Sequence, residues 1–149
     1  MNLFRFLVPL LIPAFLQAEI LSVGDCSSCN YTSIQTAIDA ASSGDTISVE
    51  PGVYEEDLKV VKTGLAVIGS DTENASVQLI GSILVAKGVR LGVLDLDLSP
   101  SSSSSVGYLV RVEGELAIGF STFSNSTNAI VVAKNAILDA FEVDIVSDI

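Results

Sequence analysis

Apolar and polar residues follow two different periods along residues 32–58, and together they predict a short helix followed by two strands. Four apolar residues have the i, i+3, i+4, i+7 spacing of one helical face: Ile34, Ala37, Ile38 and Ala41. Residues 46–50 then alternate between polar and apolar, as in a half-buried strand. Pro51-Gly52 predicts a tight turn into the second strand, because proline presets φ and glycine accepts a positive φ.

The ends of this helix are predicted from its flanking residues. Thr32 is the expected N-cap, and Gln35, three residues later, would complete a capping box. Gly44 is expected to end the helix in the left-handed conformation. A helix in this place would cover strand edges that could otherwise pair with another chain.

The rest of the chain contains a degenerate repeat. Turn residues recur at spacings of 24, 26 and 21 residues: Gly64, Gly88, Gly114 and Asn135. Periods of this length are typical of solenoids. Counting six residues from the last three turns predicts one buried file, made of Leu94, Phe120 and Phe141. Counting three residues from all four predicts a second file, made of Val67, Leu91, Ala117 and Leu138.

These files predict that the fold class is all-β. The predicted architecture is a right-handed parallel β-helix with a short N-terminal capping α-helix. Equivalent residues on successive coils would then stack about 4.8 Å apart. The same register places Lys87, Glu113 and Lys134 in an outward ladder of alternating charge. Two other folds are less well supported. A βαβ unit would need a second long helical pattern, and a sandwich would need hairpin signals between the strands.

The residues around the helix also carry a family resemblance. Tyr31-Thr32-Ser33-Ile34-Gln35, Gly44-Asp45-Thr46-Ile47 and Pro51-Gly52-x-Tyr54-x-Glu56 resemble the N-terminal region of the pectin lyase-like superfamily, as does Leu65-x-Val67-Ile68-Gly69. The nearest relatives implied are pectinesterase-like and parallel β-helix repeat proteins. The resemblance covers residues 31–99 and implies the fold. Enzymes and non-enzymes of the superfamily share this opening, so it leaves the activity open.

The N-terminal residues predict export. Residues 1–18 contain one basic residue, an apolar run and a small residue, Ala18, after which we expect a signal peptide to be cleaved. An uncleaved anchor is the alternative. Residues 19–31 would form an entry loop and residues 32–149 the β-helix. The sequence ends within an apparent coil with no polar cap, so we expect this β-helix to be incomplete at its C-terminus.

Charge narrows the range of partners. The chain has 18 acidic and 7 basic residues, no histidine and a net charge of −11. Binding to phosphate-rich surfaces needs clustered lysine and arginine, so we expect no nucleic-acid partner and, after signal cleavage, no membrane.

Cys26 and Cys29 lie three residues apart in the entry loop. In an exported chain this spacing favours a disulfide. A redox-active pair, a zinc site, free thiols and an intermolecular pair are the alternatives, although zinc would need two further ligands. Three sequons follow the Asn-x-Ser/Thr pattern and predict N-glycosylation in a eukaryotic host, at Asn30, Asn74 and Asn125.

Four acidic residues are the candidate ligand-binding side chains: Asp95, Asp97, Glu142 and Asp144. We expect each pair to lie on one strand face, with the two pairs on the same side of the solenoid. They would then be two coils apart, about 9.6 Å, which is too far to share one calcium ion. We therefore expect no metal site and no cofactor, with Ca²⁺ as the one candidate ion. The signatures of the pectinesterases are missing, so no residue receives a catalytic role.

Two functional hypotheses follow. The first is a secreted, non-catalytic β-helix that presents a surface to glycans or proteins, with self-association through the open C-terminal coil as a further expectation. The second is the N-terminal part of an enzyme acting on cell-wall or extracellular polysaccharide. Such an enzyme would be pectinesterase-like or pectate-lyase-like, a carbohydrate esterase or a polysaccharide lyase.

Overall fold

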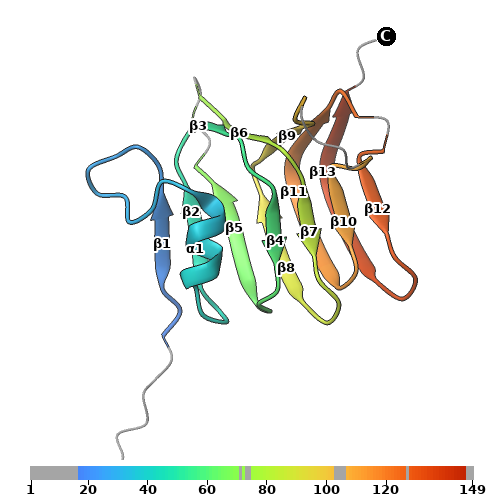
Figure 1. The fold of residues 1–149 in the computed structure, drawn as a ribbon, viewed down its shortest axis with the longest axis horizontal. Helices are drawn as coiled ribbons and strands as arrows, with labels where there is room; N and C mark the ends of the chain where they lie inside the picture. The colour runs from blue at the N-terminus through green and yellow to red at the C-terminus, as the bar shows by residue number, and fades with distance from the viewer. Residues whose placement is uncertain (1–16, 71, 73–74, 103–106, 127, 147–149) are drawn as a thin grey trace, which may run out of the picture.

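The protein is a parallel β-solenoid of about five turns, with one short helix among the residues that the structure describes (Figure 1). The computed structural model describes residues 17–70, 72, 75–102, 107–126 and 128–146. The predicted signal peptide therefore lies almost wholly outside the described residues. The described elements in chain order are β1 (Ile20–Val23), α1 (Ile34–Ala40), β2 (Thr46–Val49), β3 (Gly52–Tyr54), β4 (Leu58–Val60), β5 (Leu65–Gly69), β6 (Val77–Ile80), β7 (Ile83–Val85), β8 (Arg90–Leu94), β9 (Asp97–Ser99), β10 (Val110–Val112), β11 (Glu115–Ser124), β12 (Ile130–Val132) and β13 (Ile137–Val146).

The strands form three faces around one core. The first face has the order β1-β2-β5-β8 and continues into the first half of β11. The second face has the order β3-β6-β9 and continues into the second half of β11, so the long strands β11 and β13 run across the corner between two faces. The third face is the sheet β4-β7-β10-β12. Every strand pairing among these elements is parallel, which confirms the predicted solenoid; its right-handed winding stays a prediction.

The core consists of apolar residues that stack on successive coils. On the first face one file is Leu65, Leu91, Leu116 and Leu138. On the second face Leu79, Leu98 and Phe123 form a file in which each residue is at most 1% exposed. On the third face the file is Leu58, Ile83, Val110 and Ile130. Each fully buried side chain of this size contributes about 1.5–3 kcal/mol to stability.

The two files predicted from the turn spacing are wrong. Leu94 and Phe141 both pair with Gly119, and Phe120 is skipped by the pairing. Phe120 is 51% exposed and Phe141 43%, so these side chains lie on the outside. In the second file, Val67 pairs with Val93, and Ala117 pairs with Gly92 on the outward side. Two causes combine. Side chains alternate along a strand, so Leu94 and Phe141 lie outward even though they share a column. The turn residues are also not equivalent: the turn before β11 is two residues shorter than those before β8 and β13, and Gly64 directly precedes Leu65, which pairs with Leu91.

The predicted ladder of Lys87, Glu113 and Lys134 is out of register for the same reason. Val85, Val112 and Val132 are equivalent, so Glu113 follows its valine directly whereas the two lysines lie one residue further on. Glu113 instead accepts a charge-assisted hydrogen bond from Arg111 Nε at 2.8 Å.

The sequence predicts that residues next to the helix cap the N-terminus of α1, but most of the cap comes from Glu56, between β3 and β4. The N-cap is Ser33, not Thr32, and its side chain accepts a hydrogen bond from the Thr36 backbone N–H. The Glu56 carboxylate accepts three more: from Ser33 Oγ at 2.8 Å, from the Ile34 N–H at 2.8 Å and from the Gln35 N–H at 2.9 Å. Gln35 completes no capping box; its Oε1 accepts from the Lys59 N–H at 2.8 Å.

The C-terminus of α1 is also held from outside. The helix ends at Ala40, and the C-cap Ala41 has an extended backbone with φ −61°. Gly44 has the expected positive φ of 97° but lies in the following turn, so it does not cap the helix. Lys62 Nζ donates to the Ala41 carbonyl at 2.8 Å and to the Asp39 carbonyl. The helix packs against β1, β2 and β4 at the N-terminal end of the core (Figure 1).

Because the Glu56 carboxylate accepts three hydrogen bonds from the N-cap and first turn of α1, Glu56→Ala should lower the free energy of unfolding by about 2 kcal/mol. Glu55→Ala is the matched control, since Glu55 is exposed and has no part in the cap. Urea unfolding followed by circular dichroism measures both variants. A Glu56→Ala protein as stable as Glu55→Ala would show that the carboxylate does not hold the helix.

Asp45 generates a pH-dependent prediction. Hydrogen bonds from the Glu19 and Ser42 backbone N–H groups, at 2.8 and 2.6 Å, lower the pKa of Asp45 from its ordinary value of 3.8, and the Lys62 charge adds to this. The ionised form is therefore favoured in the folded state, so its stabilisation is present above pH 3.8 and is lost as pH falls through the lowered pKa. Asp45→Asn should be less stable than the wild type at pH 7, with a gap that closes toward pH 2. Thermal melts across this range measure the gap, and a gap constant with pH would contradict the assignment.

Candidate functional site

The outward side of the second face presents one continuous row of polar side chains. Gln78 pairs with Asp97, Asp97 with Thr122, and Thr122 with Asp144. The row is outward because the residues that alternate with it, such as Leu98 and Phe123, are buried. With about 4.8 Å between neighbouring strands, the row spans roughly 14 Å along the solenoid axis.

A second outward row runs beside the first. Ser99 is equivalent to Ser124, and the Ser124 hydroxyl donates to the Leu98 carbonyl at 3.4 Å. The two rows enclose a shallow cavity of about 290 Å³, and its lining includes Gln78, Asp97, Ser99, Thr122 and Ser124. We call these two rows together the Asp97 face; its first row ends at Asp144.

The Asp97 face is bordered by an unusual corner. Asp95, Phe120 and Glu142 are equivalent residues between the first and second faces, and their φ angles are 56°, 50° and 49°. A left-handed backbone is a genuine outlier for a residue as bulky as phenylalanine. Strained residues of this kind concentrate at functional sites, so the corner at Phe120 supports a functional site at this border.

Two phenylalanine rings are exposed at this corner. The Phe120 and Phe141 rings meet edge to face, with their centroids 5.4 Å apart. A cavity of about 420 Å³ beside them is lined by Phe120, Ser121, Thr122, Glu142 and Asp144. Apolar rings and polar oxygens therefore line one continuous strip of surface.

The structure separates the four acidic residues predicted as ligands into two groups. Asp97 and Asp144 lie in one row, with Thr122 between them. Asp95 lies between β8 and β9 at the corner, so it does not share a strand with Asp97. Glu142 occupies the equivalent corner position in β13. Among the described residues there is no group of three or more His, Cys, Asp or Glu side chains that could hold a metal ion, and a calcium site stays an untested expectation.

Gln78, Thr122, Phe120 and Phe141 belong to this surface but were not predicted as site residues. The sequence predicts both phenylalanines in the core because counting six residues from a turn residue ignores the alternation of side chains along the strand and, for Phe120, the shorter turn before β11. The alternation of residues 95–99 was the available signal, since Asp97 lies between two leucines that point inward.

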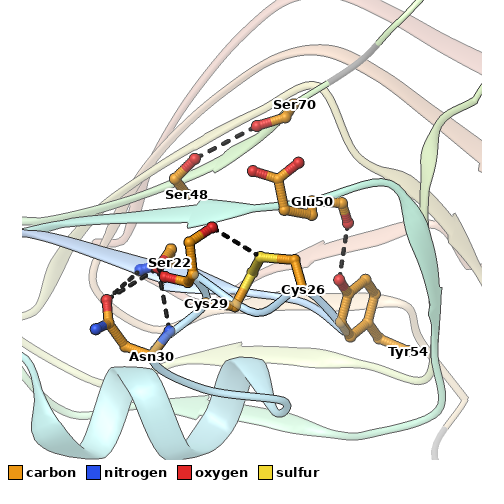
Figure 2. The surroundings of a disulfide bond; sticks show 9 residues. Ser22, Cys26, Cys29, Asn30, Ser48, Glu50, Tyr54 and Ser70 are labelled. Atoms are coloured by element: carbon orange, nitrogen blue, oxygen red, sulfur yellow. Dashed lines mark hydrogen bonds between the residues drawn. A yellow bond between two sulfur atoms is a disulfide. The ribbon is translucent and has the colours of Figure 1, made fainter.

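The predicted disulfide is confirmed. Cys26 and Cys29 are joined, with their Cα atoms 5.1 Å apart, in the loop between β1 and α1 (Figure 2). The exposed Asn30 beside it accepts hydrogen bonds at Oδ1 from the Ser22 N–H and hydroxyl, at 3.3 and 2.9 Å. Asn125 is also exposed, whereas Asn74 lies outside the described residues. Glycosylation of all three asparagines stays a prediction.

Comparisons of the chain with family models, with curated proteins and with solved structures gave no match. No helix in the described part of the chain is long and apolar enough to cross a membrane.

Proposed function

We propose that this protein is a secreted, non-catalytic β-helix of the pectin lyase-like type that binds a neutral glycan through the Asp97 face. The observation that carries the proposal is the outward row of Gln78, Asp97, Thr122 and Asp144, which runs beside the exposed rings of Phe120 and Phe141.

The chemistry of the row suits a ligand rich in hydroxyl groups. Carboxylates accept hydrogen bonds only, the threonine hydroxyl donates and accepts, and the glutamine amide supplies two donors and an acceptor. Sugar hydroxyls can satisfy each of these groups. The C–H faces of a sugar ring can pack against an exposed aromatic ring, which has a large apolar surface.

Charge favours a neutral rather than an acidic glycan at this face. Asp97 and Asp144 would repel a carboxylate or sulfate brought against them. The two described arginines are engaged elsewhere, since Arg90 pairs with Glu115 and Arg111 pairs with Glu113. The Asp97 face therefore has no arginine with which to hold an anion.

Several features support secretion of a glycoprotein. The Cys26–Cys29 disulfide is typical of oxidising compartments, and Asn30 and Asn125 are exposed. The chain also begins with the pattern of a signal peptide. The superfamily motif agrees with the fold, because its Glu56 caps α1 from the neighbouring coil.

A protein partner or second copy bound along β13 is the second candidate. Its apolar side chains Ile137, Phe141 and Ile145 are 57%, 43% and 66% exposed. Binding to this strand would cover these side chains. Light scattering with size-exclusion chromatography would detect a second copy as a doubled mass.

Glycan binding is tested with variants matched by residue type. An array of neutral oligosaccharides selects the ligand, and titration calorimetry measures its affinity. Asp97→Asn and Thr122→Ala should each weaken binding about tenfold, because each removes hydrogen bonds to the ligand. Phe120→Asn should weaken it while leaving the fold intact, since asparagine tolerates a left-handed φ. Asp139→Asn and Thr46→Ala are the controls, on outward positions of the first face.

Absence of binding to any neutral glycan, or equal losses in the control variants, would overturn the proposal. Turnover of a polysaccharide that requires Asp97 would replace it with the enzymatic alternative. That outcome is measured as hydrolysis of ester groups on the polysaccharide or as the appearance of oligosaccharides with an unsaturated end, with and without added calcium.

A further inference from the structure

The turns that connect the third face to the first differ in length. Four residues, 86–89, connect β7 to β8, and four residues, 133–136, connect β12 to β13. Only two residues, Glu113 and Gly114, connect β10 to β11 on the coil between them. The middle coil is therefore recessed between two longer turns.

The two longer turns have the same construction. Their sequences are Ala-Lys-Gly-Val and Ala-Lys-Asn-Ala. Each is closed by a backbone hydrogen bond from its fourth to its first residue, of 3.1 Å in residues 86–89 and 3.0 Å in residues 133–136. Each has a left-handed third residue, with φ 78° at Gly88 and 68° at Asn135. Lys87 and Lys134 consequently occupy equivalent positions on either side of the recess.

The recess is a cavity of about 580 Å³, which we call the lysine notch. Lys87 and Lys134 line it from the two longer turns, and Gly114 lines it on the middle coil. A Cβ atom on Gly114 would lie 2.2 Å from the Val89 carbonyl oxygen and 2.5 Å from that of Ala86. The middle turn thus packs directly against the preceding turn, and this contact requires glycine.

The lysine notch is locally basic on an acidic protein. Of the 7 basic residues in a chain of net charge −11, three line it: Lys87, Arg90 and Lys134. Glu113 and Glu115 line it as well, but each forms an ion pair with an arginine, at 2.8 and 3.0 Å. These are the two ion pairs among the described residues, so neither lysine is neutralised by one of them.

We propose that the lysine notch binds an oxyanion group, a sulfate or a carboxylate, between the ammonium groups of Lys87 and Lys134. The two lysines are two coils apart, about 9.6 Å, and their flexible four-carbon stems allow both ammonium groups to reach one anion in the recess. The notch lies at a different corner from the Asp97 face, and the proposal does not rest on the function assigned to that face.

Four probes distinguish the source of the anion. They are inorganic sulfate, a chondroitin sulfate tetrasaccharide, a hyaluronan tetrasaccharide that carries carboxylates only, and the neutral chitotetraose. Affinities come from titration calorimetry at low ionic strength. We expect at least one anionic probe to bind, with an affinity that falls as salt is added, and chitotetraose not to bind at the notch. Which anionic probe binds identifies a free anion, a sulfate ester or a carboxylate as the ligand group.

Lysine variants locate the binding. Lys87→Gln and Lys134→Gln should each weaken the anionic probe about fivefold, and the double variant about 20-fold. Lys59→Gln is the matched control, because Lys59 is an exposed lysine in β4, outside the notch, and its loss changes the net charge equally. A two-residue insertion between Glu113 and Gly114 should fill the recess and abolish binding while both lysines remain.

Three results would overturn the proposal: no binding of any anionic probe, equal binding of chitotetraose, or equal weakening by Lys59→Gln, which would assign the effect to overall charge. Should the insertion variant fail to fold, as judged by circular dichroism, the lysine variants decide the question, because their side chains lie on exposed turns.

Discussion

Stacking of like residues on successive coils is the constraint on which this structure depends. Each strand pairs in parallel with its equivalents, so the apolar residues that alternate along it fall into files such as Leu79, Leu98 and Phe123. A slip of one residue would turn a whole file outward. The file also fixes the outward rows. When the buried residues of successive coils are stacked, the polar residues next to them in each strand are stacked as well.

Long-range contacts hold the N-terminal end of this stack. The helix α1 has only 7 residues, which is too short to be stable alone in water. Glu56 supplies acceptors at its first turn, and Lys62 supplies a donor at its last carbonyls. Both side chains come from the coil that the helix covers, so the helix and the first coils stabilise each other.

Both proposed binding surfaces arise where the repeat departs from regularity. The Asp97 face borders the corner at which Phe120 has a left-handed backbone and an exposed ring. The lysine notch exists because one turn is two residues shorter than its neighbours. A regular solenoid would give flat faces, whereas these departures produce a ridge of aromatic rings and a recess between two lysines.

Sequence reasoning predicted the features that depend on local pattern. Patterns within a few residues of the sequence predicted three of them: the apolar stripe of α1, the alternation in β2 and the disulfide of Cys26 and Cys29. The register was not predicted, because turn lengths vary and the corner residues Asp95, Phe120 and Glu142 are not the glycines that usually mark a left-handed backbone. The capping role of Glu56 was missed because its partners, near Ser33, are more than twenty residues away in the chain.

The most direct test of this account is the coil register, measured by solution NMR on uniformly labelled protein. Nuclear Overhauser contacts across the parallel strands report which residues are neighbours on successive coils. The account predicts contacts that connect Leu79 with Leu98 and Leu98 with Phe123, with the Phe123 ring among them in the interior. Contacts that instead align Leu98 with Thr122 or Ser124, or antiparallel contacts between these strands, would contradict it.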